Sequence, residues 1–185
     1  MGHPSGIPVY YAFANPQPGY NNSDVLNVLL NIDSLQFTPG SKYEYSNSGY
    51  VLLSILVGRV SGISFAEFVH QRIIEPLSMD YCTVKDEFAS EIMNPAIGND
   101  TSGNISDYKF FTTGGGGFFA SVKDLYLWDR ALYTGELLDP QLLRDEAWKS
   151  GVLNDGALTN YGFGWNLNPR HPEIVRHGGE LEGFR

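Results

Sequence analysis

The chain has 185 residues, of which 42% are hydrophobic and 14% aromatic, so it can bury a core and does not belong to the disordered class. Its net charge of −9 and its pI of about 4.7 exclude the basic face that nucleic-acid binding requires. The single cysteine, Cys82, excludes an internal disulfide and a cysteine-based metal site, and the four histidines lack ligand-like spacing, so neither a metal nor a cofactor is predicted.

The chain is predicted to begin with a loop over residues 1–20, which hold several Pro and Gly residues. Ser23 and Asp24 are expected to cap a short helix that runs to Leu30. The sequence Phe-Thr-Pro-Gly at 37–40 predicts a turn.

A longer helix is predicted over 47–60, closed by Gly62. Its apolar residues cover most of its circumference, so we expect it to be deeply buried. Ser64 and Glu67 have the spacing of a capping box for the next helix, which Pro76 ends.

The second half is predicted to contain two further helices separated from the first set by irregular chain. The Asn- and Ser-rich stretch 99–104 is expected to be a surface loop. Ser121 and Asp124 form a capping-box pattern for a helix that ends at Gly135. An Asp-Pro pair at 139–140 has the signature of a helix start.

The C-terminal part is predicted to form a small antiparallel sheet. Aromatic and apolar residues alternate with Gly and Asn over 161–167, the period of a strand, and 173–176 is predicted to be a second strand. The linker 168–172 suits a turn between antiparallel neighbours. With no interdomain linker visible, the fold class is α+β, with residues 1–185 forming one domain.

Two features bear on location. Residues 1–6 lack the basic and apolar regions of a signal peptide. The longest apolar run, 50–57, is too short to span a membrane, so no membrane segment is predicted.

The tripeptide Tyr45-Ser46-Asn47 is the first candidate for chemistry. In an extended segment residues i and i+2 point the same way, so Tyr45 and Asn47 would share one side and Ser46 would turn inward. A phenol beside an amide at a helix N-terminus can relay a proton and orient an acyl group. The structural alternative is a simple helix cap next to a half-buried aromatic residue.

The second candidate is His177-Gly178-Gly179, at the end of a predicted strand. Two glycines let a substrate backbone come close to the strand, and a histidine there supplies a hydrogen-bond donor or a cation. The alternative is a strand-terminal turn with a solvated histidine.

In combination these segments carry a resemblance to a known family. Residues 37–50 resemble the second-motif region of the serine β-lactamase and penicillin-binding-protein family, which includes class C β-lactamases, DD-peptidases, D-aminopeptidases and esterases. Similar order and spacing appear in four further segments: 3–8, 64–79, 115–125 and 161–179. The resemblance implies the β-lactamase/transpeptidase-like fold, of which this chain would cover mainly the helical region plus a small part of the sheet.

The resemblance also implies roles for individual residues. Tyr45 would be the general base or proton relay, and Asn47 would contact the substrate amide. His177 would stand where the family more often has Lys, binding a carboxylate or polarising Tyr45. Gly178 and Gly179 would let the substrate approach, and the backbone N–H of Glu180 would supply one oxyanion-hole donor.

The family's nucleophile motif, Ser-x-x-Lys, is missing upstream of Tyr45. Ser106 and Lys109 match it by letters but follow Tyr45 in a polar, glycine-rich loop, and we expect them to lie away from the cleft. The chain also ends at Arg185, before the family's last strands and closing helix, so we expect a partial domain.

The resemblance therefore implies a fragment of a serine acyl-transfer hydrolase that acts on β-lactams, D-amino-acid peptides or small esters. Without its nucleophile the fragment is expected to be inactive. The alternative is a non-catalytic binding module of the penicillin-recognising type. The expected partner is a small-molecule or peptide substrate, and the family points to a secreted or cell-envelope parent; the oligomeric state stays open.

Overall fold

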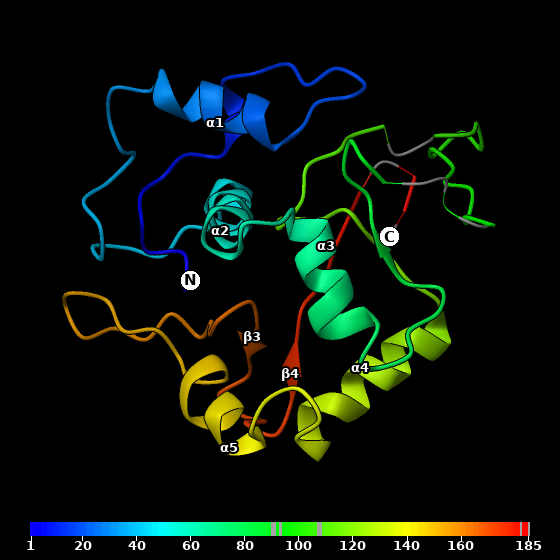
Figure 1. The fold of residues 1–185 in the computed structure, drawn as a ribbon. Helices are drawn as coiled ribbons and strands as arrows, with labels where there is room; N and C mark the ends of the chain where they lie inside the picture. Colours follow the sequence, from blue (N-terminus) through cyan, green and yellow to red (C-terminus); the bar gives the residue numbers. More distant parts are fainter. Residues whose placement is uncertain (90–91, 93, 107–108, 182, 185) are drawn as a thin grey trace.

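The computed structural model describes residues 1–89, 92, 94–106, 109–181 and 183–184 (Figure 1). It is a mixed α+β structure in which helices pack around small antiparallel sheets. Its helices are η1 (Tyr10–Ala12), α1 (Asn22–Leu30), α2 (Asn47–Ser61), α3 (Phe65–Val69), η2 (His70–Ile74), α4 (Val122–Thr134), α5 (Pro140–Leu142) and η3 (Leu143–Ala147), and its strands are β1 (Thr83–Val84), β2 (Phe118–Phe119), β3 (Asn166–Leu167) and β4 (Val175–Arg176).

Helix α1 starts two residues earlier than predicted, because its cap is Asn21 rather than Ser23. The Asn21 side chain accepts hydrogen bonds from the backbone N–H groups of Ser23 and Asp24, and Asp24 accepts from the Asn21 N–H at 3.0 Å. This reciprocal pair satisfies amides that have no partner inside the helix.

Helix α2 confirms the predicted bounds, and Gly62 closes it in the left-handed conformation with φ of 77°. The expectation of deep burial is wrong. Val51 is 1% exposed, but Val60 is 80% exposed on the same helix. Its one-sided packing against α1 and α3 explains the difference, because the apolar pattern does not state how many neighbours a helix has.

The main core lies between α3, η2, β1 and α4. Ser64 caps α3 by accepting from the Glu67 N–H at 3.0 Å. The predicted capping box is incomplete, because the Glu67 carboxylate accepts from the Gln71 side-chain amide instead of the Ser64 N–H. The buried cluster consists of Val69, Ile74, Leu77, Met79, Val84 and Ala131.

Helix α4 has the predicted capping box. Asp124 is fully buried and accepts from the N–H and the hydroxyl of Ser121, at 2.9 and 2.7 Å. Burial opposes the ionisation of Asp124, but these bonds and one from the Tyr81 N–H outweigh it and lower its pKa. Gly135 ends the helix in the left-handed conformation, as predicted.

The strand predicted over 161–167 is largely wrong. Only Asn166–Leu167 forms β3, which pairs antiparallel with β4 as expected for the linker at 168–172. Gly164 has φ of +84°, and Gly162 lies so close to the Ala147 carbonyl that a side chain would not fit. The chain therefore turns at these glycines. The pairing of β1 with β2 was not predicted.

A buried polar cluster joins α1, α2 and the glycine loop that starts at Gly114. The Asn22 side-chain amide donates to Ser54 Oγ at 2.9 Å and to Thr113 Oγ1 at 2.8 Å, and the Thr113 N–H donates back to Asn22 Oδ1 at 2.8 Å. These bonds place the glycine loop directly beside the first turns of α2.

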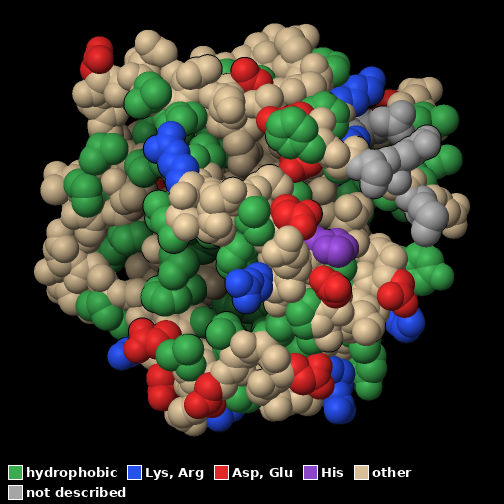
Figure 2. All heavy atoms as spheres, viewed as in Figure 1, with side chains coloured by type: hydrophobic (Ala, Val, Ile, Leu, Met, Phe, Trp, Pro, Cys, Tyr) green, Lys and Arg blue, Asp and Glu red, His purple; other side chains and the backbone are tan. Residues whose placement is uncertain are grey.

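The surface is rich in apolar groups. Hydrophobic side chains reach the surface at many places on the face shown in Figure 2. Among the described residues no single helix is long and apolar enough to cross a membrane. Helix α2 and the following α3–η2, which are bent by 79° to each other, together have the length and apolar composition of a membrane span.

Candidate functional site

The site is built around the extended segment that enters α2. The Tyr45 hydroxyl donates a hydrogen bond to Asn47 Oδ1 at 3.1 Å, so the two side chains share one side as predicted. Ser46 between them is 4% exposed and turned inward. Burial, and after it the neighbouring Tyr11, raise the pKa of Tyr45, so its phenol keeps its proton at neutral pH.

His177 follows β4 directly and lies beside Tyr45. The centroids of the two rings are 5.8 Å apart with 41° between their planes. In Figure 1 the C-terminal segment rises from β4 past α3, and the ring contact with Tyr45 brings two segments distant in sequence together. Tyr45 therefore lies against both Asn47 and His177, so the three side chains are neighbours as predicted. The prediction that all three line one cleft is met by Asn47 alone.

Both ring nitrogens of His177 have partners. Nδ1 lies 2.6 Å from the carbonyl oxygen of Gly178, which only accepts, so Nδ1 carries a proton. Nε2 lies 2.9 Å from the Tyr161 hydroxyl, which donates to a neutral ring or accepts from a charged one. His177 thus keeps both partners in either charge state. Burial raises the pKa of Tyr161, so this hydroxyl stays protonated.

The ring of His3 packs against Tyr45 and two further tyrosines. His3 is 5% exposed, and its ring centroid is 4.3 Å from Tyr45, 5.1 Å from Tyr50 and 4.8 Å from Tyr161. The cluster is apolar around the rings, and this low-dielectric setting favours neutral forms of its titratable groups.

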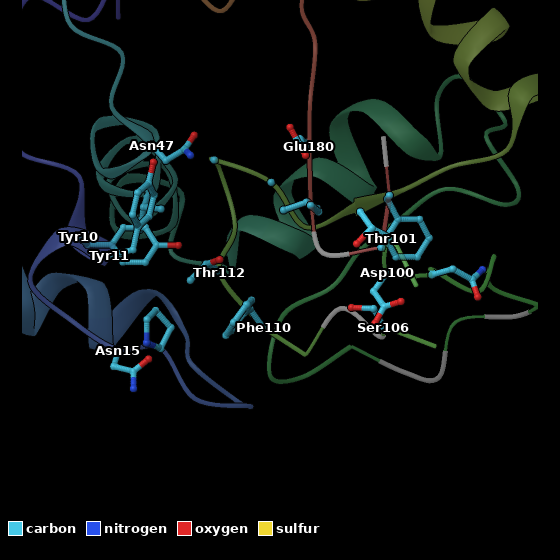
Figure 3. A pocket seen from close by; sticks show the side chains of 18 residues that line it. Tyr10, Tyr11, Asn15, Asn47, Asp100, Thr101, Ser106, Phe110, Thr112 and Glu180 are labelled. Atoms are coloured by element: carbon cyan, nitrogen blue, oxygen red, sulfur yellow. The ribbon is translucent and has the colours of Figure 1, made fainter. Parts of the chain in front are cut away.

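A cavity of about 1140 Å³ opens beside this cluster (Figure 3). Asn47 and Glu180 line it, together with Tyr10 and Tyr11. In Figure 3 Asn47 and the two tyrosines lie on one side, and Asp100, Thr101 and Ser106 lie on the other. The cavity is large enough for a small-molecule or peptide ligand.

The two glycines after His177 leave open space. Gly178 and Gly179 are exposed, and no atom of the described residues lies within 4 Å of where a side chain would begin on either. A ligand backbone could approach this stretch closely.

Ser106 is placed differently from the prediction. It is half-buried and lines the same cavity as Asn47, whereas Lys109 is exposed. The loop 99–104 is exposed as predicted, held by Asp100, which accepts from the N–H groups of Ser102 and Asn104 at 2.8 Å. Among the described residues, Ser106 Oγ makes no hydrogen bond to Tyr45 or Lys109.

In the described ranges no group of three or more His, Cys, Asp or Glu side chains is placed to hold a metal ion. Cys82 is free and half-buried, and burial raises the pKa of its thiol to about 11.

Sequence reasoning missed His3 and Tyr161 as members of the site. Tyr161 was assigned only to a strand and His3 only to a loop. The alternation around Tyr161 and the Pro-rich segment around His3 are local patterns. Neither pattern predicts a contact with a residue that is tens of positions away in the sequence.

Known proteins resemble this chain over nearly its whole length. The Beta-lactamase family profile matches residues 1–185. Penicillin-binding protein 4* of Bacillus subtilis (strain 168) is 30% identical over 209 residues, covering 100% of this chain and 46% of that protein. D-aminopeptidase of Gluconobacter oxydans (strain 621H) is 29% identical over 201 residues, covering 98% of this chain and 36% of that protein.

The fold also matches a solved structure. The octameric penicillin-binding protein homologue from Pyrococcus abyssi superposes with a TM-score of 0.74 at 24% identity, over 91% of this chain and 42% of that one. The chain thus spans less than half the length of each of these relatives.

Proposed function

Because the chain belongs to the beta-lactamase family, we propose that it supplies the Tyr-x-Asn and His-Gly-Gly parts of the active site of a serine acyl-transfer hydrolase. Residues 1–185 would form one partial domain of that enzyme. The observation that carries the proposal is the convergence of Tyr45, Asn47 and His177 beside a large cavity.

In this proposal Tyr45 relays a proton. A serine hydroxyl attacks the substrate carbonyl and gives up its proton to the Tyr45 oxygen, while Tyr45 passes its own proton to the leaving group. The raised pKa of Tyr45 suits a phenol that relays and does not suit a phenolate base. Water then hydrolyses the acyl-enzyme.

The neighbouring residues orient the substrate. Asn47 accepts from Tyr45 through Oδ1, which leaves its amide NH₂ group to donate to a substrate carbonyl. His177 binds a carboxylate or polarises Tyr45, and it keeps both of its own partners when charged. The Glu180 N–H, after Gly178 and Gly179, supplies an oxyanion-hole donor.

The substrates are β-lactams, D-amino-acid peptides or small esters. Support comes from relatives named as a penicillin-binding protein and a D-aminopeptidase. The open backbone at Gly178 and Gly179 agrees with a ligand that lies along the chain.

We further propose that these 185 residues alone form no acyl-enzyme. The nucleophilic serine and its lysine act as a unit with Tyr45, and removing the nucleophile of such a unit removes nearly all of its rate. Tyr45 as a protonated phenol cannot replace them.

The test is labelling with a fluorescent penicillin and a fluorophosphonate probe, followed by intact-mass analysis. The 185-residue polypeptide should stay unlabelled, and the full-length polypeptide that continues this sequence upstream should label once. Stoichiometric labelling of a serine in the shorter chain would refute its inactivity. A folded full-length protein that binds penicillin without labelling would favour the non-catalytic binding module.

A further inference from the structure

His3 contacts the backbone on both sides of Tyr45. Its carbonyl oxygen accepts from the Glu44 N–H at 3.1 Å, and its ring Nδ1 accepts from the Ser46 N–H at 3.1 Å. Ser46 is the N-cap of α2, so its amide has no partner within that helix. His3 is the partner that this amide has in the folded chain.

The second of these bonds determines the tautomer of His3. A backbone N–H only donates, so Nδ1 must carry a free lone pair and the proton must be on Nε2. Burial, ahead of nearby charges, lowers the pKa of His3 to about 4, which agrees with a neutral ring at neutral pH. His177 has the opposite arrangement, with its proton on Nδ1.

The ring of His3 also supports the Tyr45 side chain. Its centroid is 4.3 Å from that of Tyr45, with 38° between the planes. The other contacts of His3, with Tyr50 and Tyr161, hold its ring in place. A ring held on several sides restricts the positions available to the phenol above it.

The backbone of His3 is adapted to this task. Its φ is +59°, in the left-handed region that few residues other than Gly adopt, although Asn, Asp and His do so more often than the rest. This conformation points the carbonyl and the ring of one residue at the same segment, and such strain persists only where its surroundings impose it.

We infer that His3 is a positioning residue that clamps the segment 44–46 through its carbonyl oxygen and its Nδ1, and thereby aims the Tyr45 hydroxyl at Asn47, which lines the cavity. The clamp stands on the geometry alone, and its effect on acyl transfer rests on the proposed function.

The test compares three variants of His3 in the full-length protein. Asn places Oδ1 where His has Nδ1 and tolerates φ of +59°, so His3→Asn should keep the clamp. In His3→Gln the acceptor lies one atom further out, and His3→Ala has none, so both should lose it. His70→Ala, at an exposed histidine, is the matched control.

Two readouts report the clamp without any activity. Imidazole ¹⁵N spectra should show His3 as the Nε2–H tautomer at neutral pH, because burial lowers the pKa of its ring. Hydrogen exchange should protect the Ser46 amide in the wild type and in His3→Asn, and should release it in His3→Gln and His3→Ala.

The third readout is the rate of acylation by penicillin. Misplacement of a reacting group by about 1 Å can lower a rate by about 100-fold, so we expect a loss of at least about tenfold in His3→Gln and His3→Ala. His3→Asn and the control should stay within about threefold of the wild type.

Three results would overturn the inference: a Nδ1–H tautomer, an unprotected Ser46 amide in the wild type, or equal behaviour of His3→Asn and His3→Gln in folded protein. If the wild type fails to acylate, the proposed function fails, and the tautomer and exchange measurements still decide the clamp.

Discussion

At the residue scale, the Tyr45 hydroxyl is the group on which the proposed chemistry depends. It donates to Asn47 at 3.1 Å and lies beside His177. We expect Tyr45→Phe in the full-length protein to lower the rate of acylation by about 10²- to 10⁴-fold, because the phenyl ring keeps the packing but cannot relay a proton. Burst-phase labelling with a fluorescent penicillin measures this rate.

The matched control for that variant is Tyr81→Phe, at a tyrosine that is 60% exposed. It should leave the acylation rate unchanged. An unaltered rate in folded Tyr45→Phe protein would remove Tyr45 from the mechanism.

His3 predicts a dependence of stability on pH. Its pKa is lowered in the folded chain from the usual 6.5 to about 4, so the unfolded chain binds a proton first as the pH falls. The free energy of unfolding should therefore be at its full value above about pH 6.5 and fall by about 2 kcal/mol toward pH 4.5. Urea unfolding at several pH values measures the slope.

His3→Asn is the reference for this slope, because it keeps the acceptor and does not titrate. Four tyrosines that stay neutral in this range face the His3 ring: Tyr43, Tyr45, Tyr50 and Tyr161. When both variants are made in the 185-residue polypeptide, the other charges near His3, the amino terminus and His177, are common to both. Equal slopes in both proteins would show that His3 does not contribute.

At the element scale, the glycine loop beside α2 requires close backbone approach. A Cβ at Gly114 would lie 2.3 Å from the Tyr50 carbonyl oxygen, and φ there is +87°. Gly114→Ala should lower the free energy of unfolding by at least about 2 kcal/mol, because both strain and overlap oppose it.

The neighbouring Gly116 provides the control, since no atom in the described part of the chain lies within 4 Å of where its side chain would begin, and its φ is not positive. Gly116→Ala should change the free energy of unfolding by less than about 0.5 kcal/mol. Comparable losses in the two variants would mean that the loop does not pack on α2 as described. Thermal or urea unfolding of both variants measures the difference.

Local sequence motifs predicted the starts of the helices better than the alternation of apolar residues predicted the strands. Ser121 and Asp124 form the expected capping box, because each partner reaches the other's backbone within three residues. The alternation of apolar residues over 161–167 predicted a longer strand than the chain forms, because a period of two indicates a strand only where the backbone can extend. At Gly162 and Gly164 the chain turns instead.

At the scale of the whole molecule, α2 leaves an apolar face uncovered. Val60 and Leu56 are 80% and 54% exposed. We expect the 185-residue polypeptide to self-associate through such surface, and Val60→Lys to reduce that association while changing the free energy of unfolding by less than about 0.5 kcal/mol. Sedimentation velocity and urea unfolding measure the two quantities.

Val51→Lys on the same helix is the contrasting variant, since Val51 is 1% exposed and a buried unpaired ammonium should prevent folding. If Val60→Lys destabilises the chain as strongly as Val51→Lys, then the outer face of α2 is covered in the folded protein.

By itself the sequence determined the family, the bounds of α2 and α4, and the sharing of one side by Tyr45 and Asn47. These depend on motifs and on bonds between residues a few positions apart, which local composition encodes. Only the tertiary structure decided that His3 accepts from Ser46, that Tyr161 pairs with His177, and which side of α2 is buried. Such contacts join segments that become neighbours only when the elements pack, so no local period records them.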